Sequence, residues 1–92
     1  MLTIDILNSF GHDIKKLKKR GYDLKPLWEA VKIIQSGEKL PPRYRDHPLI
    51  GNWKSHRDCH IKGDWVLIYS VLEDEGVLQL VRTGTHDDLG ID

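Results

Sequence analysis

The chain has 92 residues, and its 14 Lys and Arg residues balance its 14 Asp and Glu residues, so the formal net charge is zero. This length predicts a single domain over residues 1–92, with one small core and no room for a large cofactor crevice. The sequence holds no apolar run near the ~20 residues of a membrane span and no signal peptide after Met1. The lone Cys59 excludes an internal disulfide, so we expect a cytoplasmic protein without a membrane partner.

The zero net charge is the sum of two opposed segments. Residues 1–62 hold 13 of the 14 Lys and Arg residues and seven acids, which gives +6. Residues 63–92 hold one Arg and seven acids, which gives −6. Polyanions respond to local patches rather than to the total charge, so neutrality does not exclude a nucleic-acid partner.

The first predicted elements are a strand and a basic amphipathic helix. Alternating apolar and polar side chains from Leu2 to Leu7 indicate the strand, and Asn8 or Ser9 is expected to cap the helix that follows. Gly21 is a natural end for this helix. Its two faces are an apolar stripe of Phe10, Ile14 and Leu17 and a basic face of Lys15, Lys16, Lys18, Lys19 and Arg20.

A second helix is expected between Asp23, which can cap its start, and Gly37, which ends it. Pro26 is tolerated in its first turn. Its apolar face consists of Leu24, Leu27, Trp28, Val31 and Ile34. Two adjacent amphipathic helices predict a hairpin whose apolar faces meet a sheet.

The second half of the chain is rich in strands. An extended connection is expected from Leu40 to Leu49, because its prolines bar a helix there. Strands are expected over Trp53 to Ile61, Trp65 to Val71 and Val77 to Arg82, with a two-residue turn at Lys62-Gly63 and an acidic turn from Glu73 to Gly76. The continuously apolar second strand is expected to be central. Thr83-Gly84-Thr85-His86 is expected to break the last strand, and the final residues to form one helical turn.

The resulting order, β-α-α-β-β-β, predicts an α+β fold. In it a helical hairpin packs on a mostly antiparallel four-stranded sheet.

Residues 53–61 form a strand with two unlike faces. Trp53, Ser55, Arg57, Cys59 and Ile61 are expected to face the helices, and the other face is a row of Lys54, His56, Asp58 and His60. Neighbours in that row are about 6.6–7 Å apart. Across the hairpin, Asp64 is expected near Ile61, at the end of the row.

Three interpretations of the row remain open. It can be a solvated polar face, as exposed strand faces commonly are. His56 and His60, with Asp58 or Asp64, are suitable metal donors, but ligands at i, i+2 and i+4 need a bend to converge and no Cys pair supports zinc. The third interpretation is RNA cleavage by its own 2′-hydroxyl, which needs a base, an acid and cations but no metal.

Other side chains extend the third interpretation. Lys54, Arg57 and Arg82 offer phosphate contacts, and Trp65 can either stack on a base or pack in the core. His12 lies in the basic helical stretch and is expected to be a surface residue.

Five blocks between residues 44 and 86 combine histidines, acids and aromatic residues. The blocks are Tyr44-Arg45-Asp46-His47-Pro48-Leu49, Gly51-Asn52-Trp53-Lys54, Arg57-Asp58-Cys59-His60, Asp64-Trp65-Val66-Leu67-Ile68-Tyr69 and Arg82-Thr83-Gly84-Thr85-His86. In order and spacing they resemble the YafQ family, within the RelE/ParE superfamily of bacterial type II toxins, and the two preceding helices suit its RelE-like fold.

The resemblance implies a toxin that cleaves mRNA in the ribosomal A site and leaves a 2′,3′-cyclic phosphate and a 5′-hydroxyl. It implies a cognate antitoxin that inhibits the toxin, operator DNA bound only by the toxin–antitoxin complex, and no cofactor or metal. We then expect residues 1–62 to supply the main contacts to ribosomal RNA, with Lys15 to Arg20 as one patch.

The resemblance also assigns roles to residues. His47 matches the histidine of the D-H-P-L block, and His60, with Asp58 as its partner, matches the histidine of the R-D-x-H block. Asp64 and Trp65 match the family's D-W pair.

His47 and His60 are expected to share acid–base or phosphate-contact work. His86 matches the T-G-T-H histidine, and the following Asp87 and Asp88 are expected to keep it partly protonated as an acid or charge stabiliser. Which histidine is the base stays open.

The sequence departs from the family at Gly90, where an aromatic residue is usual, and carries two acids just before it. Reduced activity or a changed codon preference would follow if that ring holds the mRNA base. Two alternatives remain: a gyrase-inhibiting toxin of the ParE type, and a weakly active relative that mainly binds antitoxin and operator.

Overall fold

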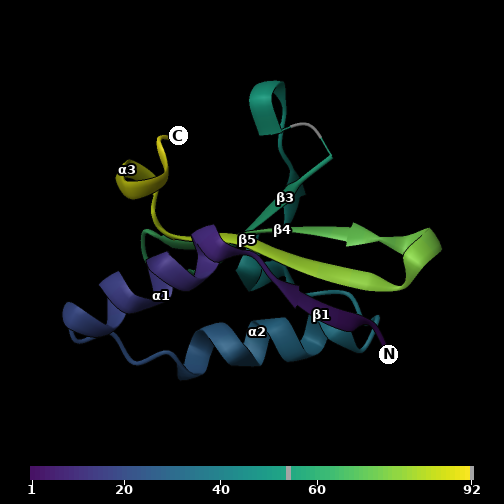
Figure 1. Ribbon diagram of the computed structural model, residues 1–92, viewed down its shortest axis with the longest axis horizontal. Coiled ribbons are helices and arrows are strands. Elements are labelled where there is room, and N and C mark those ends of the chain that lie inside the picture. Colours follow the sequence, from purple (N-terminus) through teal and green to yellow (C-terminus); the bar gives the residue numbers. More distant parts are fainter. Residues whose placement is uncertain (54, 92) are drawn as a thin grey trace.

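The computed structural model describes residues 1–53 and 55–91 and shows two helices under a twisted five-stranded sheet (Figure 1). The strands are β1 (Thr3–Ile6), β2 (His47–Pro48), β3 (Arg57–Lys62), β4 (Trp65–Leu72) and β5 (Val77–Thr85). The helices are α1 (Asn8–Lys19), α2 (Lys25–Gln35) and α3 (His86–Leu89). The sheet order is β1-β5-β4-β3-β2, with β1 parallel to β5 and the other neighbours antiparallel. The expected α+β fold and the central position of β4 are confirmed.

The expected four-stranded sheet is wrong by one strand. β2 is a two-residue strand in the segment that the prolines marked as extended, and it pairs antiparallel with β3, His47 opposite Asp58. A strand of two residues has too few side chains to show an alternating pattern, so the sequence did not reveal it.

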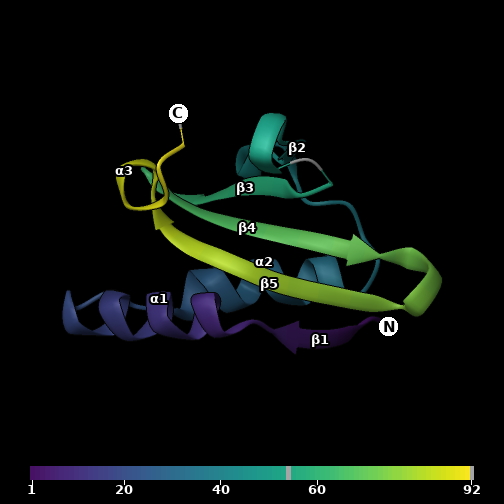
Figure 2. The same ribbon diagram turned by 45° about the horizontal axis from the view of Figure 1, so that its top comes forward.

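Helices α1 and α2 cover one face of the sheet. Helix α3 and the 3₁₀ turn at residues 51–53 lie on the other face (Figure 2). The core between helices and sheet includes the expected stripe residues Phe10 and Leu17, and Cys59 from β3. Trp28 is 39% exposed, so its expected place on the buried face is wrong. It instead lies at the rim of the core, with its ring edge-to-face to Phe10 at 6.0 Å.

Both helix starts differ in detail from the expected caps. Leu7 precedes α1, and the Ser9 hydroxyl donates to the Val81 carbonyl at 2.6 Å, so Ser9 ties α1 to β5 and does not cap the helix. Asp23 does accept a hydrogen bond from Lys25 N at 3.0 Å, at the start of α2. Gly21 and Gly37 follow the two helices with φ of +84° and +85°, as expected of helix ends.

The boundaries of the strands are set by pairing with neighbouring strands. The predicted strand from Trp53 to Ile61 begins only at Arg57, because residues 51–53 form a 3₁₀ turn and Ser55 has φ of +74°. The tight turn is Gly63-Asp64 and not 62–63, since Lys62 pairs with Trp65. Asp64 therefore lies in the turn and not opposite Ile61.

The expected break at Thr83-Gly84-Thr85 is also wrong. β5 continues through these residues because they pair with Trp65, Val66 and Leu67 of β4. The expected helical turn follows as α3.

A smaller apolar cluster fills part of the face opposite the helices. Its buried residues are Val66, Ile68, Val81 and Leu89. Leu89 anchors α3 to the sheet in this way. Over residues 1–53 and 55–91, no helix is long and apolar enough to cross a membrane.

Candidate active site

The centre of the candidate site is the pair Asp58 and His60 on β3. They lie two residues apart and so on the same face of the strand. The Asp58 side chain is 1% exposed and the His60 side chain 21%. Asp58 Oδ1 lies 3.9 Å from His60 Nε2 and 3.5 Å from His47 Nδ1. One buried carboxylate oxygen is therefore shared between two imidazoles.

His47 reaches this centre from β2. Because β2 pairs with β3, His47 lies directly opposite Asp58. Its Nδ1 lies 2.9 Å from the Arg45 carbonyl oxygen, which can only accept, so Nδ1 carries a hydrogen and the lone pair of the neutral ring is on Nε2. The His47 side chain is half exposed, and its ring centroid is 6.4 Å from that of His60.

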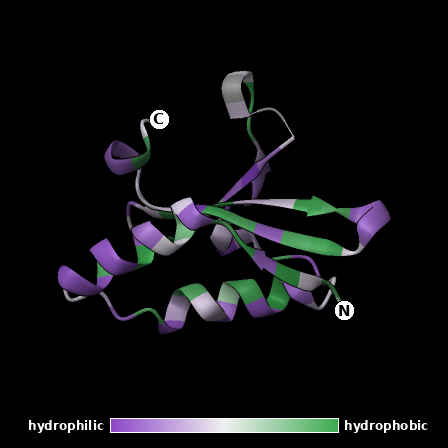
Figure 3. Ribbon diagram, viewed as in Figure 1, coloured by the Kyte–Doolittle hydropathy of each residue, from purple (hydrophilic) through white to green (hydrophobic). Residues whose placement is uncertain are grey.

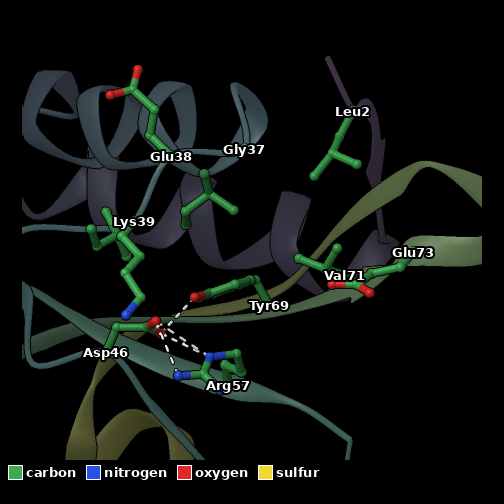
Figure 4. Close-up of a pocket in the computed structure, with 11 residues that line it drawn as sticks. Leu2, Gly37, Glu38, Lys39, Asp46, Arg57, Tyr69, Val71 and Glu73 are labelled. Carbon is green, nitrogen blue, oxygen red and sulfur yellow. Dashed lines mark hydrogen bonds and ion pairs between the residues drawn. The ribbon is translucent and has the colours of Figure 1, made fainter.

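The loop that carries His47 is anchored through Asp46. Figure 4 shows the Asp46 carboxylate between Tyr69 and Arg57, at the edge of an open pocket. The Tyr69 hydroxyl donates to Asp46 Oδ1 at 2.5 Å, and Arg57 donates through Nε and a terminal nitrogen at 3.1–3.3 Å. Burial, and then the bond to Asp46, raises the pKa of Tyr69, so its hydroxyl remains a donor. Arg45, which ends the 3₁₀ turn Pro42–Tyr44 just before Asp46, has φ of +47°.

His86 closes the other side of the site from the start of α3. Its ring centroid lies 5.3 Å from that of His60, which makes His60 the middle of a row of three imidazoles. His86 Nδ1 is hydrogen-bonded to the Asp64 carboxylate of the β3–β4 turn. The carboxylate that contacts the ring is therefore that of Asp64, and the expected effect of Asp87 and Asp88 on the protonation of His86 stays a prediction. Successive residues of a helix point to different sides, and the partner of His86 comes from a separate turn.

The electrostatics of the site favour a neutral His60. Burial lowers the pKa of His60 below 6.5; the Asp58 charge opposes this, and His86, Arg45 and His47 add to the lowering. At pH 7 the ring then offers a lone pair, which is what a base or a metal ligand needs. The positive charge of Arg45 is close enough to the site to act on His60 and, by the same means, on a phosphate.

The same residues fit a metal ion. One ligand atom from each of Asp58, His60 and His86 can be chosen so that all three lie within 4.8 Å of one another. Asp58 Oδ1 is also a buried oxygen without a hydrogen-bond partner among the described residues, and a carboxylate with two imidazoles is an ordinary donor set for a transition metal. The expected obstacle, divergence of ligands along one strand, is removed because His86 comes from α3.

The structure separates the remaining predicted contacts from this row. Trp65 is 4% exposed, and its ring NH donates to the Thr83 hydroxyl at 2.8 Å, so it packs in the core and the base-stacking alternative is wrong. Arg57 is paired with Asp46, and Arg82 with the buried Asp13 at 2.7 Å. Both guanidinium groups remain partly exposed, so each can still meet a phosphate beside its ion pair.

Three further predicted positions lie off the row. Lys54 lies outside the described residues. His56 precedes β3, and its ring is edge-to-face to Trp53 at 5.7 Å, so it is not a member of the row. His12 is exposed on α1, as expected.

Sequence reasoning missed Asp46 and Arg45 as functional neighbours of His47. The signal available was their position in the block before His47. It also missed the buried Asp13 of α1. The signal was its position, three residues after Phe10 and four before Leu17, which places this acid on the apolar face of the helix.

Comparison with known proteins identifies the family. A sequence model of the family described as "Bacterial toxin of type II toxin-antitoxin system, YafQ" matches residues 2–90. The chain belongs to this family. The mRNA interferase toxin YafQ of Escherichia coli strain K12 is 38% identical over 84 residues, which cover 90% of this chain and 89% of the relative.

Solved structures agree with this membership of the YafQ family. A metal-bound toxin from Helicobacter pylori is 44% identical with a TM-score of 0.90, covering 97% of this chain and 99% of that one. A chain of the E. coli DinJ–YafQ complex is 37% identical with a TM-score of 0.86, covering 97% and 98%. The resemblance drawn from the five blocks and the RelE-like fold are confirmed, and one similar toxin binds a metal.

Proposed function

We propose that this YafQ-family toxin is an mRNA interferase that cleaves mRNA on the ribosome and is inhibited by a cognate antitoxin. The observation that carries the proposal is the row His47, His60 and His86, which brings three proton-transfer groups from β2, β3 and α3 side by side. Support comes from the E. coli relative, which is named an mRNA interferase, and from the DinJ–YafQ complex. Because separate blocks of the sequence converge here, a solvated polar row is the weaker interpretation.

The chemistry needs two proton transfers at one phosphate. The 2′-oxygen forms a bond to phosphorus while the bond between phosphorus and the 5′-oxygen breaks. A base takes the 2′-hydroxyl proton and an acid gives one to the leaving 5′-oxygen, which yields a 2′,3′-cyclic phosphate and a 5′-hydroxyl.

His60 is suited to be the base and His86 the acid. The lowered pKa of His60 keeps its ring neutral at pH 7. His86 holds a carboxylate, Asp64, at Nδ1, which orients the ring and compensates its charge when Nε2 also carries a proton. Asp58 is not hydrogen-bonded to His60; from its buried position, 3.9 Å from Nε2, it acts on the ring through its charge.

His47 and the nearby cations are assigned to the phosphate. His47 presents Nε2 at the exposed rim of the site, where the ring donates to a phosphate oxygen once Nε2 also carries a hydrogen, and Arg45 adds positive charge beside it. The lysines of the basic face of α1 lie outside the row and are assigned to ribosomal RNA. Figure 3 shows that the C-terminal half of α1 is strongly hydrophilic.

Primer-extension mapping on translated and untranslated copies of one mRNA tests the proposal. We expect cuts only on the translated copy, in register with codons, with 5′-hydroxyl and cyclic-phosphate ends. Adding the antitoxin should abolish them. The variant with His47, His60 and His86 all replaced by Ala should make no cuts, whereas His12→Ala, which changes an exposed histidine outside the row, should cut like the parent.

Two results would contradict the proposal. One is full growth arrest by the triple variant. The other is intact mRNA together with inhibited DNA supercoiling, which would favour the gyrase-inhibiting alternative.

A further inference from the structure

His86 sits on a helix too short to hold itself in place. α3 has only four residues, and an isolated helical turn is unstable because its nucleation cost is not recovered by added hydrogen bonds. Since His86 is the first residue of α3, whatever fixes this turn also fixes the imidazole. Leu89 anchors the helix from below, at its other end.

The start of α3 is held by a capping box that centres on Asp88. The Thr85 hydroxyl accepts from Asp88 N at 3.1 Å, and Asp88 Oδ2 accepts from Thr85 N at 3.0 Å. The fit is close, since a Cβ added at Gly84 would meet the Asp88 side chain at 3.1 Å. Asp88 is therefore fixed against the end of β5, with His86 between the two bonded positions.

The same carboxylate is gripped from α1. Two terminal nitrogens of Arg20 donate to the two Asp88 oxygens at 2.7 and 3.1 Å, a bidentate pair across 68 positions of sequence. Arg20 holds the pKa of Asp88 well below its ordinary range, so the carboxylate is ionised throughout the physiological range. Arg20 is the residue that ends α1.

A second ion pair makes this grip a two-point attachment. Asp13 lies seven residues before Arg20, hence on the same face of α1, and accepts from Arg82 at 2.7 and 3.1 Å and from Thr83 N at 3.1 Å. Asp13, Arg20, Arg82 and Asp88 line one small cleft between α1 and the end of β5. α1 thus holds both the last part of β5 and the turn that follows it.

We propose that Arg20 and Asp88 are positioning residues that hold His86 against His60 and Asp64 for RNA cleavage. The inference rests on the proposed function and deepens it at the same site. Arg20 thus differs in role from the neighbouring lysines of α1, because its guanidinium binds Asp88 and is not assigned to ribosomal RNA. The ion pair also gives Asp88, an acid beside an RNA site, a structural use.

The test compares Arg20→Ala, Asp88→Asn and the double variant in single-turnover cleavage on programmed ribosomes. Each single variant should lower the rate at saturating toxin about tenfold, since a displacement well under 1 Å suffices for such a loss. The toxin concentration that gives half the maximal rate should change less than twofold. The double variant should lose no more than either single one, because the two residues act as a pair.

Two further variants sharpen the test. Arg20→Lys keeps the charge but not the two-pronged contact, so it should recover only part of the rate. Lys32→Ala removes the same unit of charge from an exposed position on α2 and should match the parent in both rate and half-saturating concentration.

Three outcomes would overturn the inference. If Arg20→Ala raised the half-saturating concentration while keeping the rate, Arg20 would be an RNA contact. If Asp88→Asn kept the parent's rate, the Arg20–Asp88 ion pair would not position His86. If the double variant multiplied the two losses, the residues would act separately.

Amide hydrogen exchange keeps this test apart from the proposed function. In Arg20→Ala the amides of Thr85 and Asp88 should exchange at least about tenfold faster, while amides in the centre of β4 keep the parent's rate. A parent protein that cuts no RNA would refute the interferase proposal alone. Unchanged exchange at Thr85 and Asp88 would refute the positioning inference whatever the protein cleaves.

Discussion

The three histidines of the candidate site are held in two different ways. His60 and its partner Asp58 lie inside β3, which is paired on both sides, so backbone hydrogen bonds of the sheet fix them. His47 and His86 lie at the ends of their elements and depend on side-chain contacts: Asp46 with Tyr69 and Arg57 on one side, Asp64 and the Arg20–Asp88 pair on the other. The strand-held centre is tolerant of distant substitutions, whereas each flank can be displaced by changing one side chain.

The largest expected effect is at the strand-held centre. His60→Gln removes the base but leaves a polar side chain of similar reach, so the cleavage rate should fall about 10²–10⁴-fold. Single-turnover cleavage on programmed ribosomes measures it, with His12→Gln as the histidine control. A loss of less than tenfold would contradict His60 as the base and would favour His47 or His86 in that role.

Metal binding probes whether centre and flank act together, because the candidate ligand set takes Asp58 and His60 from β3 and His86 from α3. A chelator should leave the cleavage rate unchanged. Added Zn²⁺ or Cu²⁺ should inhibit, since a ligated imidazole has no lone pair for proton transfer, with about 90% of the rate lost at ten times the Kd. Titration calorimetry with Cu²⁺ should show weaker binding to His86→Gln. Loss of activity on chelation and recovery with metal would instead mean that a metal takes part in catalysis.

The pH dependence of the cleavage rate tests whether His60, at the centre, is the base, because the pKa of His60 is lowered. Burial lowers the pKa of His60 from 6.5, and a base acts in its unprotonated form. The rate should therefore show no loss as the pH falls to 6.5, and should drop about tenfold per unit only below the lowered pKa. His60→Gln should lose this acid limb. A limb that begins above pH 7 in the parent would contradict His60 as the base.

The family and every helix and strand except β2 could be predicted from the sequence, whereas Asp58 beside His60 was the one contact within the site that could be. Helical spacing located α1 and α2 because their stripes, such as Phe10 and Leu17, are local patterns. The end of β5 and the turn at Gly63-Asp64 depend on pairing with β4, which no local pattern contains.

The same limit applies within the site. Alternation placed Asp58 and His60 on one face, but β2 is what buries Asp58 under His47. The acids nearest to His86 in sequence, Asp87 and Asp88, were expected to act on it, whereas its partner Asp64 is 22 positions away and meets it through the folding of the hairpin. Sequence blocks identify which residues belong to a site; the contacts among them are set by tertiary structure.

The anchor of His47, formed by Asp46 and Tyr69, should contribute measurably to the stability of the fold. Asp46→Ala leaves the hydroxyl of the buried Tyr69 without its acceptor, which should lower the free energy of unfolding by about 1–3 kcal/mol. Tyr69→Phe removes the hydroxyl itself, and Asp46 keeps its bonds to Arg57, so this variant should lower it by only about 0.5–1.5 kcal/mol. Urea denaturation measures both. If Asp46→Ala were as stable as the parent, the His47 loop would not depend on this anchor.

The smallest expected effect concerns Gly90, where the family usually has an aromatic residue. Gly90 ends α3 with φ of +66°, and a Cβ there would meet no atom within 4 Å, so a side chain has room but a strained backbone. Gly90→Phe should therefore destabilise by about 1–2 kcal/mol while adding a ring that can stack on a base. Gly90→Asn, which tolerates the left-handed backbone, separates strain from stacking. We expect Phe, and not Asn, to lower the half-saturating toxin concentration in ribosomal cleavage by a few-fold, about 1 kcal/mol of stacking. If both variants bind like the parent, the base is held by other residues, and the glycine costs this toxin nothing.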